Sequence, residues 1–203
     1  MDEHYVFLFP DKNSDPNTLD GILKIGSVAV KQHGINGLVI DPWNKIEHEM
    51  ARGETENNYI SRTLDQIYEF SEVNGVFVVI VAHPTKPVNR DKSGNYGRVT
   101  LYSISGSANW YNKPDVGIIL HRDKYDKDGN FIDNGPTKVV VEKMRFEEIG
   151  NEGSDEIYYD WWRGGRFVDD DTQLDQRNFH KQKLKDEQEK EFEKNEDEDD
   201  TPF

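Results

Sequence analysis

The sequence predicts an α/β fold with a largely parallel sheet. Three apolar runs have the length of buried strands, at residues 37–41, 76–82 and 116–122. The first two are separated by a segment with helical periodicity, long enough for the crossover that parallel neighbours need. The later apolar runs follow one another without such a segment. We therefore expect the sheet to finish in antiparallel hairpins.

The N-terminal part predicts a short strand and then a helix. The strand covers residues 4–10 (HYVFLFP). Over residues 16–34 apolar side chains recur at helical spacing, with Asp15 or Asn17 in position to cap the helix and Gly34 in position to end it. This helix would lead into the first strand of the sheet.

Residues 54–75 predict a second helix, which would connect the first two buried strands. Its apolar residues also recur at helical spacing, and Gly75 follows as a terminator. Residues 76–82 (VFVVIVA) are apolar throughout, so we expect both faces of this strand to be buried, as in a parallel sheet. Residues 83–103 then form a loop rich in Lys, Arg, Gly and Asn.

The C-terminal part predicts shorter elements. Residues 105–115 favour a short helix or turn, and residues 137–146 a fourth strand. The Asp-Gly pair at 128–129 is a hairpin signal, and residues 156–168 have the pattern of an amphipathic hairpin.

Composition and charge exclude several classes of protein. The chain has no cysteine, which excludes disulfides and thiolate metal sites. No leader pattern and no apolar run near the roughly 20 residues of a membrane span occur, so we expect a cytoplasmic protein, bacterial or from a phage-infected host. The net charge of −15 argues against a general DNA-coating protein. Residues 169–203 hold 14 Asp and Glu against 6 Lys and Arg, so we expect a domain over 1–168 and a disordered acidic tail over 169–203.

Two polar residues follow the first two strands, and ligands of parallel α/β sheets sit beyond such carboxyl ends. They are Asp41, after GLVI, and His83, after VFVVIVA. A carboxylate there can hold a water of Mg²⁺, and an imidazole there can donate to a phosphate. Each residue alone also fits a simpler interpretation, Asp41 as a turn or cap residue and His83 as a surface histidine.

The order of motifs resembles the RecA-type motor of ring helicases over about residues 4–168. The motifs are GLVIDPWN, VFVVIVAHPTKP, ISGSANWYNKPDVGIILHRD and VVVEKMRFEEIGNEG. The nearest likeness is to the mitochondrial Twinkle and phage primase–helicase family, with the bacterial DnaB-type helicases further off. The resemblance implies a RecA-like P-loop NTPase core, of which this chain matches the C-terminal half.

The resemblance also implies roles for individual residues. Asp41 would be the Walker B carboxylate on Mg²⁺, and His83 the sensor of the γ-phosphate of ATP or another NTP. Arg145 would be the arginine finger and Lys143 a supporting phosphate contact, both reaching into a neighbouring subunit of a ring, most often a hexamer. Taken alone, EKMRF also fits any half-exposed strand.

The same resemblance places a DNA-binding loop at residues 86–107, which otherwise fits a solvated surface loop. Cations there would meet phosphates of single-stranded DNA, and a small-residue stretch would let the backbone approach the strand. The residues are Lys86, Arg90, Lys92, Arg98, Ser105, Gly106 and Ser107.

One part of the motor is missing from the sequence. No G-x-x-x-x-G-K-[ST] phosphate loop occurs, and neither does the catalytic Glu that the family carries beyond it. We therefore expect no ATP hydrolysis by this chain alone, which would be a fragment of a longer helicase or work with a second chain. The Asp-Pro-Trp-Asn after the first strand also departs from the family pattern, and the sequence gives Trp43 no role.

The last residues, EDEDDTPF, resemble tips that dock on replication proteins. Asp199 and Asp200 would steer toward a basic groove, and Phe203 would anchor there, on DNA polymerase or another replisome protein. A solubilising tail is the simpler interpretation. For the whole chain, a 5′→3′ replicative helicase competes with a RecA-fold recombination or plasmid-replication ATPase, and with a non-enzymatic remnant that binds DNA or a partner.

Overall fold

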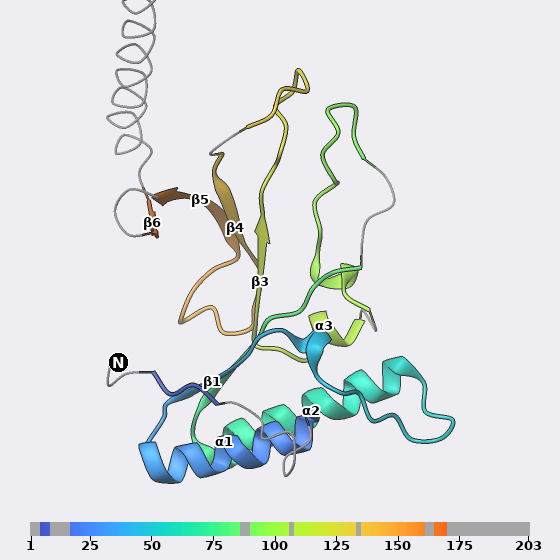
Figure 1. Cartoon of the computed structure of the whole chain (residues 1–203), viewed down its shortest axis with the longest axis vertical. Coiled ribbons are helices and arrows are strands. Elements are labelled where there is room, and N and C mark those ends of the chain that lie inside the picture. Colours follow the sequence, from blue (N-terminus) through green and yellow to red (C-terminus); the bar gives the residue numbers. More distant parts are fainter. Residues whose placement is uncertain are drawn as a thin grey trace, which may run out of the picture. The chain divides into compact units, whose positions relative to one another are not determined.

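The computed structural model describes residues 5–8, 17–85, 90–105, 108–132, 135–160 and 165–169. The chain divides into two compact units. The first comprises Met1–Asp91, Tyr96–Ile119 and Val140–Gly153, and the second comprises Lys92–Asn95, Leu120–Val139 and Ser154–Phe203. Figure 1 shows the elements along the chain.

The first unit begins with helix α1 (Leu19–His33). Its cap is Thr18, whose hydroxyl accepts a hydrogen bond from the Gly21 N–H at 3.2 Å. This corrects the expected cap, since the Asn17 side chain instead donates to the Lys45 carbonyl and Asp15 lies outside the described residues. Gly34 ends the helix as expected, with a φ of 64° that an L side chain disfavours.

Two parallel strands follow, joined by a helical crossover. Strand β1 (Gly37–Ile40) pairs with strand β2 (Phe77–Ile80) in a register that runs from Gly37↔Phe77 to Ile40↔Ile80. The crossover is helix α2 (Glu56–Asn74), capped by the Thr55 hydroxyl and ended by Gly75. The predicted parallel pair is therefore confirmed, and the carboxyl ends of both strands lie at one edge.

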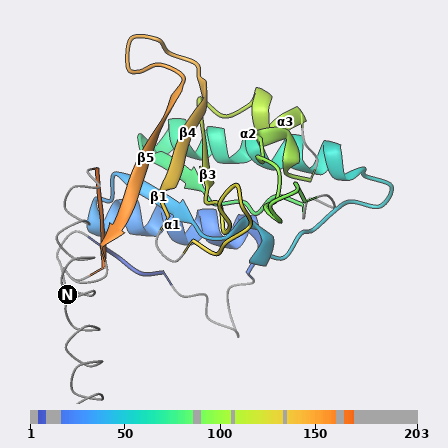
Figure 2. The same cartoon turned by 90° about the horizontal axis from the view of Figure 1, so that it is seen from above.

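Helices α1 and α2 cover one face of this two-stranded sheet (Figures 1 and 2). Gly26 lets α1 approach closely, because a Cβ there would lie 3.1 Å from Phe70 and 3.2 Å from Leu38. The main core holds buried side chains of both helices, β1, the segments that flank the strands, and α3: Leu19, Leu38, Ile40, Trp43, Ile46, Tyr59, Ile60, Leu64, Ile67, Phe70, Val76 and Trp110. Val78 and Ile80 of β2 pack against it and are partly buried.

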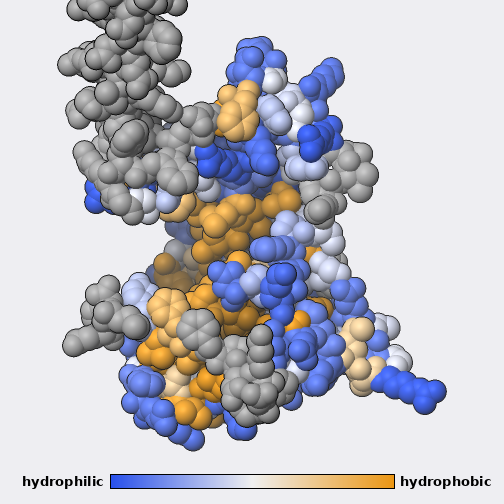
Figure 3. Space-filling view, in the orientation of Figure 1, coloured by the Kyte–Doolittle hydropathy of each residue, from blue (hydrophilic) through white to orange (hydrophobic). Residues whose placement is uncertain are grey.

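The opposite face of β1 and β2 is open, which corrects the expectation that strand 76–82 is buried on both faces. Phe77 is 62% exposed and Val39 is 59% exposed, and Val79 and Val81 are also on the surface. In the part of the chain that the structure describes, helices cover one face alone. Figure 3 shows apolar side chains forming patches on the surface of the molecule.

The rest of the first unit consists of short elements that pack on the main core or on a second, smaller core. They are η1 (Trp43–Lys45), η2 (Leu101–Ser103), α3 (Ala108–Asn112) and parts of β3 (Val116–His121) and β4 (Thr137–Met144). Leu101, Ile119 and Val140 form this core. Arg145 follows the end of β4 instead of lying within it as the range 137–146 implied.

The second unit contains the remainder of those two strands, most of β5 (Gly153–Asp160), and β6 (Arg166–Val168). Strands β3-β4-β5-β6 form a four-stranded sheet, so the described strands make two sheets where the sequence predicted one. Strand β5 pairs with β6 antiparallel, which confirms the predicted antiparallel hairpin at the end. Asn95 is buried there, and its side-chain oxygen accepts hydrogen bonds from the Lys124 and Tyr125 N–H groups.

Two expectations, for the N-terminal strand and the acidic tail, end differently or stay untested. Tyr5–Leu8 form no strand, and the rest of the predicted strand 4–10 lies outside the described residues. The acidic tail from residue 170 onward, with Asp199, Asp200 and Phe203, also lies outside them. Among the residues described, no helix combines the length and apolar character needed to cross a membrane.

Candidate functional site

The structure brings Asp41 and His83 to the same edge of the β1–β2 sheet. Asp41 directly follows β1, His83 follows β2, and both are exposed. Three hydrogen bonds tie the two chain segments together beyond the strands. The Val81 N–H donates to the Ile40 carbonyl at 2.9 Å, the Trp43 N–H to the Val81 carbonyl at 2.8 Å, and the His83 N–H to Asn44 Oδ1 at 2.7 Å. The backbone of this edge is therefore fixed, while the carboxylate and imidazole face solvent.

Trp43 anchors this edge to the core, which gives it the role that the sequence lacked. Its side chain is 3% exposed and packs edge-on against Trp110, with ring centroids 5.5 Å apart. The ring of His48 also packs on Trp43, at 5.1 Å, and His48 shares a 3.1 Å hydrogen bond with the Tyr59 hydroxyl. Burial lowers the pKa of His48, and Glu56 opposes that shift. The sequence signal for this anchor was weak: a large apolar residue, Trp43, within the polar segment Asp-Pro-Trp-Asn.

The predicted finger residues are engaged within their own chain. Arg145 Nη1 donates to Asp115 Oδ1 at 2.7 Å, and Nη2 donates to the carbonyls of Asn112 and Lys113 at 3.0 and 3.2 Å. Lys143 Nζ donates to the carbonyls of Tyr111 and Asn112 at 2.5 and 3.0 Å. Two cations thus satisfy the free carbonyls at the end of α3.

The surroundings of Lys143 lower the pKa of its ammonium group. Burial lowers the pKa of its ammonium group most, the positive charge of Arg145 lowers it further, and Asp115 acts in the opposite direction. Within the described part of the chain, no hydrogen bond or ion pair joins Lys143 or Arg145 to Asp41 or His83. The structure therefore places Asp41 near His83, and Lys143 near Arg145, but among the described residues no such contact joins the first pair to the second.

The predicted DNA-binding loop is described in part. Arg90 and Tyr96 form an antiparallel bridge, and the Arg90 guanidinium lies 4.7 Å from the Tyr96 ring centroid. Arg98 is exposed, and Lys92, which belongs to the second unit, is exposed as well. Lys86, Gly106 and Ser107 lie outside the described residues.

The two ends of this loop are fixed to the frame. The Thr85 N–H and hydroxyl both donate to the Ser103 carbonyl, at 2.8 and 2.7 Å. Ser105 donates through its hydroxyl to Glu56 at 2.5 Å, and its carbonyl accepts from Trp110 Nε1 at 2.8 Å. The loop closes directly after His83-Pro84, so the predicted sensor and the predicted DNA contacts share one anchored base.

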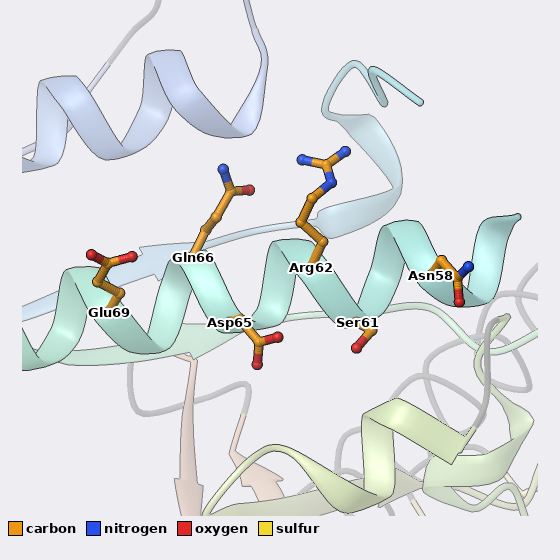
Figure 4. A pocket seen from close by; sticks show the side chains of 6 residues that line it. All are labelled: Asn58, Ser61, Arg62, Asp65, Gln66 and Glu69. Carbon is orange, nitrogen blue, oxygen red and sulfur yellow. The ribbon is translucent and has the colours of Figure 1, made fainter. Parts of the chain in front are cut away.

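A shallow depression along α2 carries no site. Figure 4 shows Arg62, Gln66 and Glu69 pointing to one side of the helix, and Ser61 and Asp65 to the other. Because these side chains point to different sides of the helix, they cannot all contact one ligand. Nor do the described residues contain a cluster of three or more His, Cys, Asp or Glu placed for a metal ion.

Known proteins share this fold and part of this sequence. No family model matches the chain. The chain is 37% identical over 143 residues to a Twinkle homolog protein, chloroplastic/mitochondrial, of Arabidopsis thaliana, a match that covers 70% of the chain and 19% of that protein. Its fold matches a solved ATPase domain with a TM-score of 0.58 at 20% identity, covering 75% of the chain and 51% of that structure.

A second solved structure, of a DnaB-like replicative helicase studied with its primase interactions, gives a TM-score of 0.56 at 19% identity. That match covers 71% of the chain and 34% of the helicase. The chain is similar in sequence to part of a Twinkle homolog, and it shares its fold with part of a DnaB-like helicase. It spans about a fifth of the length of the Twinkle homolog.

These findings confirm the predicted RecA-like α/β fold and the predicted likeness to replicative helicases. The individual roles of Asp41, His83, Lys143 and Arg145 stay predictions, and so do the boundaries at 168 and 169. Sequence reasoning missed Trp43, Asn44 and Asp115, which hold the predicted residues in place. Their partners lie far along the chain, so no local pattern marks them.

Proposed function

We propose that this chain forms part of an ATP-driven replicative DNA helicase that unwinds 5′→3′. The observation that carries the proposal is the fixed edge at which Asp41 and His83 lie together, in a chain related to a Twinkle homolog. Parallel α/β sheets bind ligands at such an edge.

In this proposal the edge binds one side of a magnesium–nucleotide complex. The exposed Asp41 carboxylate fits a hard cation that keeps most of its waters, and His83 fits a donor to the γ-phosphate of ATP or another NTP. The Mg²⁺ ion supplies neutralisation of phosphate charge. One carboxylate and one imidazole do not suffice to bind the complex, so the phosphate loop must come from another polypeptide segment.

The open face of β1 and β2 supports this need for a further segment. Val39, Phe77, Val79 and Val81 expose apolar surface, which monomeric domains seldom leave uncovered in a contiguous patch. Covering it would stabilise the sheet and would seat a further element beside the strand ends. We propose that the half-core with the phosphate loop occupies this face.

Arg145 and Lys143 would act on the nucleotide of a neighbouring subunit, in a ring that we propose to be a hexamer. A guanidinium offers a planar fork of donors that suits phosphoryl oxygens, and its charge stabilises the charge that develops on them. To reach a neighbour, Arg145 must exchange Asp115 and the carbonyls of Asn112 and Lys113 for phosphate oxygens. The pair is exposed on both sides, so this exchange costs little.

The loop after His83 would contact single-stranded DNA in the channel of the ring. Arg90, Arg98 and Lys92 would meet phosphates, together with Lys86, and the stretch Ser105, Gly106 and Ser107 would approach the strand through its backbone. The proposal also places the acidic tip, with Asp199, Asp200 and Phe203, on DNA polymerase or another replisome protein. The setting would be the cytoplasm of a bacterium or a phage-infected host.

The test joins a half-core that carries a phosphate loop to the front of this chain and measures ATP hydrolysis with and without single-stranded DNA. We expect DNA-stimulated hydrolysis that Asp41→Ala abolishes. Glu72→Ala, at an exposed carboxylate on α2, is the matched control and should leave hydrolysis unchanged. Hydrolysis that survives Asp41→Ala would overturn the assignment of the magnesium-side carboxylate.

A further inference from the structure

Tyr102 is a half-exposed aromatic residue near the end of the predicted DNA-binding loop. It lies in η2 and is 50% exposed. Its ring stacks on Tyr111 of α3, with ring centroids 4.9 Å apart and planes 19° from parallel. Elements η2 and α3 pack side by side (Figure 1). Tyr111 covers one face of the ring, and half of the Tyr102 residue stays exposed to solvent.

Local hydrogen bonds hold Tyr102 in this position. The side chains of Thr100 and Ser103 cap η2 reciprocally, and the Leu101 N–H donates to Glu142 Oε2 at 2.6 Å. Leu101 itself is buried in the second core, over Gly117, where a Cβ would collide with its side chain. The ring is therefore preorganised, and a ligand that stacks on it loses little free energy to ordering.

The charge around Tyr102 favours an anionic chain. Residues 96–107 contain Arg98 and no Asp or Glu, in a protein whose net charge is −15. The carboxylate of Glu142 lies near by and accepts a hydrogen bond from the Leu101 N–H, which fixes its position. Lys143 Nζ lies 5.4 Å from the centroid of the Tyr111 ring and donates to the Tyr111 carbonyl, so a second cation lies beside the stacked pair.

We propose that Tyr102 is a stacking platform for a base of single-stranded nucleic acid. The inference rests on the proposed DNA contact of the loop and adds a mode of binding that phosphate contacts alone do not provide. A base would continue the stack that Tyr111 begins, and every base has a π-face, so binding would tolerate any sequence.

The experiment measures the affinity of the whole chain for fluorescent oligothymidylate and for an abasic strand of equal length and equal phosphate number, at one salt concentration. Tyr102→Leu should weaken oligothymidylate binding about fivefold or more and leave abasic binding unchanged. Tyr102→Phe keeps the ring and should bind both strands like the unaltered chain. Tyr68→Leu removes a tyrosine of α2 that is 52% exposed, and should change neither affinity.

Three outcomes would overturn the inference. Equal affinity of the unaltered chain for both strands would mean that bases add nothing, while the phosphate contacts of the proposed function would survive. Equal weakening of both strands by Tyr102→Leu would mean that the ring only supports the loop. Absence of binding to either strand would also remove the DNA contact of the proposed function.

A crosslinking measurement identifies the stacked ring directly. Iodouracil in a strand crosslinks under ultraviolet light to an aromatic side chain on which it stacks, and mass spectrometry of the peptides should find Tyr102. A crosslink found at Tyr96 instead would overturn the choice of residue. Oligouridylate in parallel with oligothymidylate distinguishes RNA from DNA as the source of the base.

Discussion

The strand-end pair, Asp41 and His83, and the finger pair, Lys143 and Arg145, differ in what their side chains contact. The strand-end pair is fixed through its backbone, and its side chains make no hydrogen bond within the residues that the structure describes. The finger pair is fixed through its side chains, which satisfy the carbonyls at the end of α3 and the carboxylate of Asp115. The first pair can therefore receive a ligand directly, whereas the second must first give up bonds.

This difference fits the two proposed modes of action. A residue that acts on a ligand in its own subunit benefits from a fixed backbone and an open side chain. A residue that acts on a neighbour needs a resting contact that is weak enough to exchange. Arg145 and Asp115 are 39% and 41% exposed, and such ion pairs contribute about 0–1 kcal/mol.

The largest expected effect is loss of hydrolysis from either pair. In an assembly completed with a phosphate-loop half, Asp41→Ala and Arg145→Ala should each lower kcat about 10³-fold or more, since an arginine finger contributes about 10³–10⁵. Mixed rings of the two variants should recover part of the activity, because an intact finger then faces an intact site. Steady-state ATPase assays of mixtures measure this recovery.

Arg52→Ala is the matched control, at an exposed arginine that forms no ion pair within the described residues. Its rings should hydrolyse ATP at the rate of the unaltered protein. Mixtures without recovery would show that Arg145 acts in its own subunit, and the distinction between the pairs would fail.

The next effect concerns the anchor of the strand-end pair. Trp43→Ala should lower the free energy of unfolding by about 3–5 kcal/mol, because a buried ring leaves a cavity beside Trp110 and His48. Urea denaturation followed by circular dichroism measures it. Val39→Ala, on the open face of β1, should cost far less. Equal losses would mean that the open face is covered in solution.

His83→Ala should separate hydrolysis from its response to DNA. Basal hydrolysis should persist, while stimulation by single-stranded DNA should fall to about the unstimulated rate, because the loop closes at Thr85 directly after His83. The ratio of rates with and without DNA measures this. Undiminished stimulation would contradict the sensor role.

Asp115→Asn tests whether the resting contact of Arg145 is weak. The free energy of unfolding should change by less than about 1 kcal/mol. The pKa of Lys143 should fall further, since Asp115 is the group that raises it. Nuclear magnetic resonance of the lysine ammonium groups follows the second effect. A large loss of stability would make the Arg145 contacts structural and would weaken its proposed action in trans.

The smallest effect concerns pH. The pKa of His48 in the folded chain lies below its ordinary value of 6.5, so the unfolded chain binds the proton more readily. The neutral form of His48 therefore favours the folded chain. This stabilisation is fully present above pH 6.5 and is lost as the pH falls from 6.5 toward the folded-state pKa. His48→Gln should flatten this part of the stability profile, measured by urea denaturation at several pH values. An unchanged slope would exclude His48 as its source.

The elements and their order follow from local features of the sequence. Gly34 and Gly75 end helices α1 and α2 with a positive φ, a backbone conformation that glycine adopts readily. This preference belongs to the residue itself, so it can be predicted from the sequence. The apolar runs predict β1, β2 and β3, and the length of the crossover predicts the parallel pairing. The shared edge of Asp41 and His83 follows from these, since parallel strands of one register place their carboxyl ends together.

The faces and side chains that the molecule uses became clear only from its three-dimensional arrangement. The apolar sequence of residues 76–82 is compatible with a strand covered on one face or on both faces, so the open face of β2 could not be predicted. The burial of Trp43, the resting partner Asp115 of Arg145 and the stack of Tyr102 on Tyr111 each join residues that local periodicity does not relate. Burial and side-chain pairing depend on elements distant in the chain, and the fold alone brings those elements together.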